Sequence, residues 1–390
     1  MRNEKGIVSI FVVIFAALLL TVITIGFIRI MVQEQQRATD SDLSSSAYDS
    51  AVAGVEDGKR VIRRCAEGDA AACNAIQNQE CDTVSAGGVA QSIGGEVMVR
   101  SEGSTDVSLN QAYTCVKINM QTDDVTVNLY QDRSLVVPLK ASGDFRSIRI
   151  RWMHRNSGDG TYVGGDASTL AVPTSPMDLT SLPPEAGWNP DAASLLRVQA
   201  ITPDTNTIRI ADLDGNFVST AFLRPANIVG GLFGPASTGQ TVAIGGDRAA
   251  EETATVITRT SPVPCSQAEY QAQGYACLAT LGVAAHNVPA GSNVAFLRLT
   301  SLYKDTSAKI ELLNDSGDVV PFDGVQPIVD STGRASNVYR RISSRVSLSM
   351  NTIDYPEYAV DVTGSLCKNY YVTVNSGMVG PNPPTCSPRP

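Results

Sequence analysis

The chain of 390 residues is 43% hydrophobic and 18% charged, a balance that supports one or two packed domains and excludes wholesale disorder. Only two residues are His, which leaves little material for imidazole chemistry, and the many Gly and Pro residues indicate turn-rich β structure. The formal net charge of -9 opposes tight, non-specific binding to nucleic acid, so such a role would need a local basic patch.

The first predicted element is an apolar segment over residues 7–28, which carries no charged side chain. As a helix it would be ~33 Å long, enough to cross a hydrocarbon core of ~30 Å. A secretory signal peptide has a shorter apolar core that ends in a small-residue cleavage site, so this segment predicts a transmembrane helix. Arg2 and Lys5 precede it, which predicts a single-pass protein with its C-terminal part outside the cytoplasmic membrane.

The helical pattern continues beyond the membrane. Residues 29–64 predict an amphipathic half of the same helix, because apolar side chains recur there at spacings of three and four. The stripe consists of Ala47, Tyr48, Ala51, Val52, Val55 and Ile62, together with the long side chain of Lys59. The first proline of the chain is Pro138, so one helix can extend from about Ile7 to Arg64.

Two segments of this helix have a recognisable pattern: Lys5-Gly6-Ile7 before the apolar run, and SAYDSAVAGVEDGKR from Ser46 to Arg60. They resemble the corresponding segments of type IV pilins, and in particular of the PilX-like minor pilins. The resemblance implies a leader of residues 1–6, cut after Gly6 by a prepilin peptidase, and a mature chain that begins at Ile7. It also implies that the helix lies in membrane lipid first and then assembles with other pilins and the pilus assembly machinery.

The sequence departs from the family at two positions. Most pilins have Glu at the fifth mature position, where this chain has Phe11, and Gly26 lies near the place of a common mid-helix Pro. An unpaired buried ammonium is costly, so the missing carboxylate favours a minor or tip pilin over a repeating subunit. The residues expected to serve helix assembly are Phe11, Gly26, Tyr48, Val52 and Val55.

A second hypothesis is a membrane-anchored extracytoplasmic binding protein or adhesin unconnected with pili. Its helix would be an ordinary anchor, and its N-terminus would stay uncut.

Under the pilin hypothesis the chain would support pilus biogenesis, adhesion or twitching motility at the cell surface.

The outer region predicts an α+β protein, in which the long helix leads into an antiparallel β-rich head. Residues 65–122 are expected to form a cysteine-bearing connector, residues 123–375 the pilin-like head, and residues 376–390 a Pro-rich tail. Loop insertions are expected near 158–189 and 225–264, which are rich in Pro, Gly, Ser and Thr. The strands predicted from alternation are 125–130, 135–139, 146–153, 194–201, 294–303 and 339–349, with hairpins 207–213/217–223 and 308–313/318–322.

All eight cysteines lie in the outer region: Cys65, Cys73, Cys81, Cys115, Cys265, Cys277, Cys367 and Cys386. No C-x-x-C motif occurs, so disulfides in an oxidising exterior are a better account than zinc or thiol redox chemistry. Eight cysteines allow 105 connectivities. Proximity favours Cys265 with Cys277 and Cys367 with Cys386.

Catalytic motifs are missing from the sequence. His154 and His286 have no acidic or cysteine neighbours at metal-ligand spacing, and neither G-x-S-x-G nor H-E-x-x-H occurs. We therefore expect no enzyme and no cofactor or metal.

Basic residues gather on one predicted strand: Arg146, Arg149, Arg151 and Arg155. Two interpretations stay open. The first is a solvated strand face paired with Asp and Glu, and the second is a surface for DNA or an acidic surface glycan.

Overall fold

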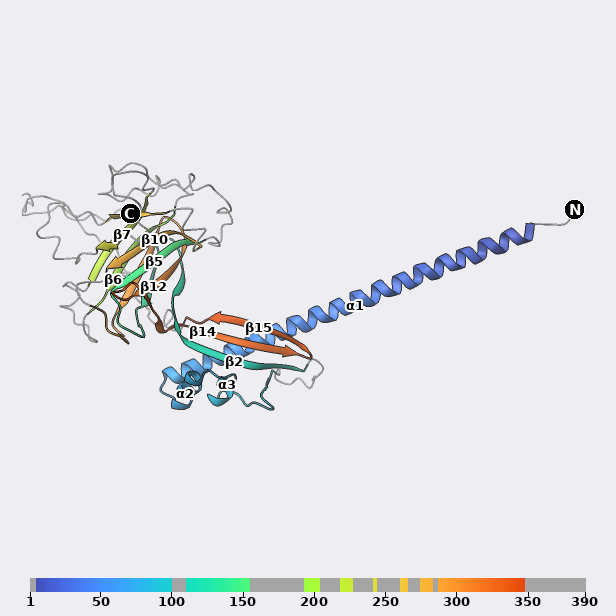
Figure 1. Ribbon diagram of the computed structural model, residues 1–390, viewed down its shortest axis with the longest axis horizontal. Coiled ribbons are helices and arrows are strands. Elements are labelled where there is room, and N and C mark those ends of the chain that lie inside the picture. The colour runs from blue at the N-terminus through green and yellow to red at the C-terminus, as the bar shows by residue number, and fades with distance from the viewer. Residues whose placement is uncertain are drawn as a thin grey trace, which may run out of the picture. The chain divides into compact units, whose positions relative to one another are not determined.

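The computed structural model describes residues 5–99, 110–154, 193–203, 218–226, 241–243, 260–265, 274–282 and 287–347. Side chains are described from Val12 onward, except at 154, 218–219, 226, 241–243, 260–262 and 264. Its first element is helix α1 (Lys5–Ala66), which runs unbroken through the apolar and amphipathic segments (Figure 1). The predicted single long helix is therefore confirmed. The absence of proline and the ion pairs of its exposed side, such as Glu34 with Arg37 and Asp57 with Arg60, are consistent with this continuity.

The second half of α1 packs on a four-stranded antiparallel sheet in the order β1-β2-β14-β15. These strands are β1 (Val97–Met98), β2 (Gln111–Thr122), β14 (Phe322–Ala335) and β15 (Val338–Arg345). Two short helices, α2 (Ala70–Asn78) and α3 (Thr83–Ala86), also contact α1 and β2. We call this assembly of α1, α2, α3 and the four strands the helix–sheet module.

Small residues let α1 approach the sheet closely. A Cβ atom on Gly333 of β14 would lie 2.1 Å from the backbone oxygen of Ala47 and 2.2 Å from the backbone nitrogen of Ala51. On the helix side, a Cβ on Gly58 would lie 2.8 Å from a methyl carbon of Val329. The glycines are therefore required by the distance between helix and sheet.

The described residues between 123 and 321 form a second set of strands. One sheet contains, in order, β13 (Val319–Val320), β12 (Thr306–Leu313), β5 (Ser147–His154), β10 (Tyr275–Gly282) and β8 (Thr241–Ala243), and β3 (Val125–Leu129) also pairs with β12. The other contains β4 (Ser134–Pro138), β11 (Phe296–Leu302), β6 (Leu195–Ile201), β7 (Val218–Ala226) and β9 (Thr260–Pro264).

These two sheets share one buried core. Along β5, Ile148, Ile150 and Trp152 alternate with Arg149 and Arg151. The side chains of the three apolar residues are fully buried. The same core contains residues of the other sheet, including Leu196, Val198, Leu297 and Leu299. Alternation on β5 and burial of both inner faces are the pattern of a β-sandwich, so we call residues 123–321 the sandwich module.

Most of the predicted strands are present within a few residues, and the α+β class is confirmed. The predicted hairpin of 308–313 with 318–322 is confirmed by the pairing of Leu312 with Val320. The predicted strand 207–213 lies outside the described residues, as does the predicted loop insertion near 158–189. Its intended partner, 217–223, overlaps β7, which pairs with β6 and β9.

The prediction of an irregular loop over 225–264 was wrong at two places, because β8 and β9 lie within it. Val263 of β9 is buried in the sandwich core although Pro262 and Pro264 flank it. A strand with two prolines is tolerated because β9 lies at the edge of its sheet and pairs only with β7 in the described part. Proline density therefore misled the interpretation of this segment.

The helix–sheet module also crosses the predicted boundary between connector and head. Residues 111–122 of the expected connector form β2. In the expected head, β14 pairs with β2, and β15 pairs with β14. Neither β10 nor most of β14 was predicted. The apolar run of β10 is buried on both faces, which removes the alternation that identifies a strand.

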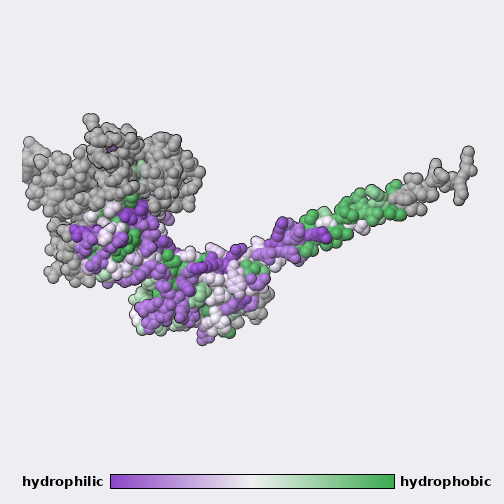
Figure 2. Space-filling model, in the orientation of Figure 1, coloured by the Kyte–Doolittle hydropathy of each residue, from purple (hydrophilic) through white to green (hydrophobic). Residues whose placement is uncertain are grey.

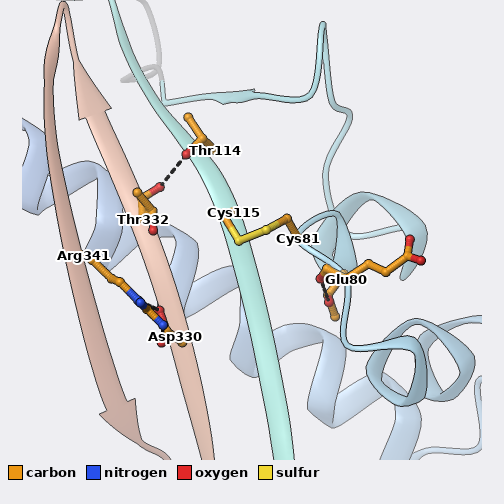
Figure 3. The surroundings of a disulfide bond; sticks show 8 residues. Glu80, Cys81, Thr114, Cys115, Asp330, Thr332 and Arg341 are labelled. Carbon is orange, nitrogen blue, oxygen red and sulfur yellow. Dashed lines mark hydrogen bonds and ion pairs between the residues drawn. A yellow bond between two sulfur atoms is a disulfide. The ribbon is translucent and has the colours of Figure 1, made fainter.

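The described residues contain three disulfides: Cys65 with Cys73, Cys81 with Cys115, and Cys265 with Cys277. The predicted Cys265–Cys277 bridge is thus confirmed, whereas Cys367 and Cys386 lie outside the described residues. Cys65–Cys73 ties the end of α1 to α2, and Cys81–Cys115 ties the segment before α3 to β2 (Figure 3). Both belong to the helix–sheet module.

Removal of Cys81–Cys115 is expected to destabilise the helix–sheet module more than removal of Cys65–Cys73. The first bridge closes a sequence separation of 34 and the second a separation of 8. Loop-closure entropy gives about 4 kcal/mol for the longer loop and about 2.5 kcal/mol for the shorter. Urea unfolding of the two Cys→Ser double variants, followed by circular dichroism, measures the difference. Equal losses would show that loop entropy does not control the stability of this module.

Candidate membrane and assembly helix

The first half of α1 has no packing partner in the described part of the chain. The stretch from Val12 has a mean hydropathy of 2.5 and none of it is buried. Its large apolar side chains are exposed, and Phe15 and Phe27 are 70% and 72% exposed. Figure 2 shows this stretch as a hydrophobic band on the described part of the helix. A surface of this kind requires lipid or protein to cover it.

The two threonine hydroxyls in the described part of this half are hydrogen-bonded within the helix. The hydroxyl of Thr21 donates to the Leu18 carbonyl oxygen at 2.8 Å, and that of Thr24 donates to the Leu20 oxygen at 2.7 Å. The helix pairs its own backbone N–H and C=O groups, and these two bonds occupy the threonine hydroxyls. The described apolar stretch therefore presents no unsatisfied hydroxyl to an apolar environment. Gly26 lies in this stretch, and a Cβ atom there would meet nothing within 4 Å.

The predicted leader and assembly residues lie along α1 as follows. Lys5, Gly6, Ile7 and Phe11 belong to the helical backbone at its start, and their side chains are not described. Val55 is buried against the sheet of the same chain. Tyr48 is 52% exposed and Val52 is half-buried, so these two side chains lie at the edge of the packed face.

A tyrosine of β2 fixes the second half of α1 by a polar contact. The hydroxyl of Tyr113 donates to Oδ2 of Asp57 at 2.7 Å, and Asp57 also pairs with Arg60 at 2.7 Å. Burial raises the pKa of Tyr113 well above its ordinary value, and the hydrogen bond to Asp57 raises it further. Tyr113 therefore stays protonated as a donor to the helix.

A second anchor lies where α1 ends. Arg64 donates to Asp69 and, at 2.7 Å, to the carbonyl oxygen of Gly88. Asp69 caps α2, because its Oδ1 accepts from the backbone N–H groups of Ala71 and Ala72. The N–H of Ala72 and the guanidinium of Arg64 together lower the pKa of Asp69. These contacts fix the turn between the two helices.

The arginines of β5 are engaged in ion pairs. Arg151 is 9% exposed and pairs with Glu311 of β12, and Arg149 pairs with the same carboxylate at 3.4 Å. Arg146 pairs with Asp315 at 3.4 Å, and Arg155 lies outside the described residues. Arg146, Arg149 and Arg151 are thus paired with acidic side chains, as the first interpretation expected, but Arg151 is buried and not solvated.

The partners of these arginines were missed by sequence reasoning. Lys309 of β12 donates to Glu311 at 3.1 Å and to Asp124 at 3.0 Å. In the register of the sheet Glu311 lies opposite Arg149, and Lys309 lies opposite Arg151. The alternating charges of both strands were the available signal, but the pairing of β5 with β12 was needed to interpret it.

Opposite effects act on the pKa of Glu311. Burial by itself raises this pKa, but the charges of Arg151 and Lys309 and their hydrogen bonds lower it more, so it lies below its ordinary value. For Lys309, burial lowers the pKa, while the hydrogen bond to Asp124 and the charge of Glu311 raise it above its ordinary value. Both groups are therefore held in their charged forms.

The described residues contain no group of three or more His, Cys, Asp or Glu side chains that could hold a metal ion. Two neighbouring strands of the helix–sheet module carry a further surface ion pair between Arg341 and Asp330, which Figure 3 shows beside the Cys81–Cys115 bridge. The exposed apolar half of α1 is thus the main candidate for a functional surface.

Comparisons with protein-family models, with curated proteins and with solved structures found no match to this chain. The fold and the helix define its class: an α+β protein whose N-terminal hydrophobic helix has the character of a membrane anchor or signal. Its disulfides indicate an extracytoplasmic domain.

Proposed function

We propose that this protein is a minor or tip subunit of a type IV pilus-like filament. The observation that carries the proposal is the continuity of α1. One unbroken helix has an apolar, fully exposed first half and a second half packed on an antiparallel sheet. This is the architecture that the pilin resemblance predicts.

Assembly would proceed by packing, without catalysis by this chain. A prepilin peptidase would remove residues 1–6, and the helix from Ile7 would leave membrane lipid for a bundle of neighbouring pilin helices. The exposed side chains of the first half supply the apolar surface for either environment. Phe11 stands where most pilins have a carboxylate. This favours a position in the filament where the chain does not have to neutralise the N-terminal ammonium of a neighbouring subunit.

The mass of the membrane-extracted chain tests the proposal. We expect a chain that begins at Ile7, and we expect Gly6→Val to leave the chain starting at Met1 because the cleavage site is lost. Gly26→Ala is the matched control, since its Cβ would meet no neighbour and the leader is untouched. The protein should also co-purify with pilins. An uncut N-terminus without such co-purification would support the anchored binding protein or adhesin instead.

A further inference from the structure

The sandwich module is inserted into the helix–sheet module at a single place. The chain leaves β2 after Thr122 and returns at Phe322, the first residue of β14. These two residues are register partners, and Gln121 likewise pairs with Asp323. Directly paired residues of antiparallel strands have Cα atoms about 5 Å apart. The ends of the insertion therefore lie where an ordinary hairpin turn would connect β2 to β14.

The two modules have separate hydrophobic cores. One core contains Val55, Ile62, Val116, Ile118 and Val329. The other contains the buried residues of β3 to β12 together with Phe322 and Val325 at the start of β14. The two sets have no residue in common, and Phe322 and Val325 are the residues of β14 that lie in the sandwich core.

The connection between the modules is polar. Gln326 is 4% exposed; its side chain accepts from the Thr126 N–H at 3.0 Å and donates to the Thr126 carbonyl oxygen at 2.9 Å. Asp124 pairs with Arg345 of β15 at 2.7 Å and with Lys309 of β12. The ladder between β2 and β14 is interrupted here, between Asp323 and Ile328. Besides Phe322 and Val325, a few hydrogen bonds and ion pairs thus join the modules, and the two cores stay separate.

We infer that the helix–sheet module is by itself the unit that enters the membrane and the filament, and that residues 123–321 are a presented domain dispensable for both steps. This inference rests on the proposed function. The helix–sheet module carries the apolar half of α1, so the sandwich module is not needed to supply the surface that enters lipid or a helix bundle. Variation of the inserted domain would leave assembly unchanged.

Hydrogen exchange on the full-length chain in detergent tests the independence of the two cores. Ile150→Ala is expected to raise amide exchange in β5, β10 and β12 about 100-fold, because it removes buried methyl groups from the sandwich core. Exchange at 116–118 and 329–331 should stay unchanged. Val116→Ala, the matched control, should produce the reverse pattern. Faster exchange in both modules after either substitution would overturn the inference.

Filament entry tests the functional part. The excision variant joins Thr122 to residue 322 through Asn-Gly, a two-residue turn suited to hairpins, and carries Phe322→Thr to remove an uncovered aromatic side chain. We expect it to be cut after Gly6 and to appear in sheared filaments as the full-length chain does. Loss of entry or of folding in the excision variant alone would overturn the inference and leave the proposed function standing. Absence of both chains from filaments would defeat the proposed function itself.

Discussion

Replacing Gly333 with alanine is expected to lower the free energy of unfolding of the helix–sheet module by about 3 kcal/mol. The new Cβ would lie 2.1 Å from the Ala47 oxygen and 2.8 Å from the Ser50 carbonyl carbon. These are backbone atoms of a helix, which cannot rotate away as a side chain can. The whole second half of α1 would therefore have to move off the sheet, which would open the core that contains Val55 and Val329.

Urea unfolding followed by circular dichroism measures this effect, since α1 dominates the helical signal. Gly143→Ala is the matched control, because its Cβ would lie 3.4 Å from a methyl carbon of Val320, within ordinary contact. That substitution should change stability by less than about 0.5 kcal/mol. Equal stability of the two variants would show that helix and sheet are not in the close contact described here.

Replacing Glu311 with glutamine is expected to destabilise the sandwich module by about 3 kcal/mol. The carboxylate is buried and faces Arg149, Arg151 and Lys309, so its removal leaves three neighbouring cations with less compensation. The exposed pair of Glu56 with Lys59 provides the control, and Glu56→Gln should cost less than about 0.5 kcal/mol. Tryptophan fluorescence during urea unfolding is a suitable signal, because both tryptophans of the chain lie between residues 123 and 321.

The pH dependence of the stability of the wild type and of Glu311→Gln gives a second test. The pKa of Glu311 in the folded state lies below its ordinary value of 4.5, so its contribution to stability is present above about that pH. The contribution is lost as the pH falls through the lower folded-state pKa. We expect the stability of the wild type to fall more steeply than that of Glu311→Gln on acidification below pH 4.5. Parallel curves would contradict the assigned role of Glu311.

Local patterns were sufficient for the elements that one strand or helix defines by itself. The apolar run and the spacing of Ala47, Ala51 and Val55 predicted α1, because a helix is specified by contacts within a few residues. Strands with one buried and one polar face, such as β5, were predicted for the same reason. Strands buried on both faces or rich in proline, β10 and β9, lack that alternation and were missed.

The candidate assembly helix was likewise predicted from sequence, because its function depends on continuous apolarity. The charge network was not, since Glu311 and Arg151 are 160 residues apart in the chain and meet only through strand pairing. The same holds for Asp124 and Arg345, which belong to different modules.

The sequence by itself determined the long helix, its apolar first half and the α+β class, and proximity in the sequence favoured the Cys265–Cys277 bridge. Only the tertiary structure decided that β14 and β15 return to pair beside β2, and hence that residues 123–321 are an insertion. It also decided that the strand arginines of β5 face carboxylates. The physical reason is that helix propensity and hydropathy are local quantities, whereas strand partners are chosen by burial and charge pairing between segments far apart in the chain.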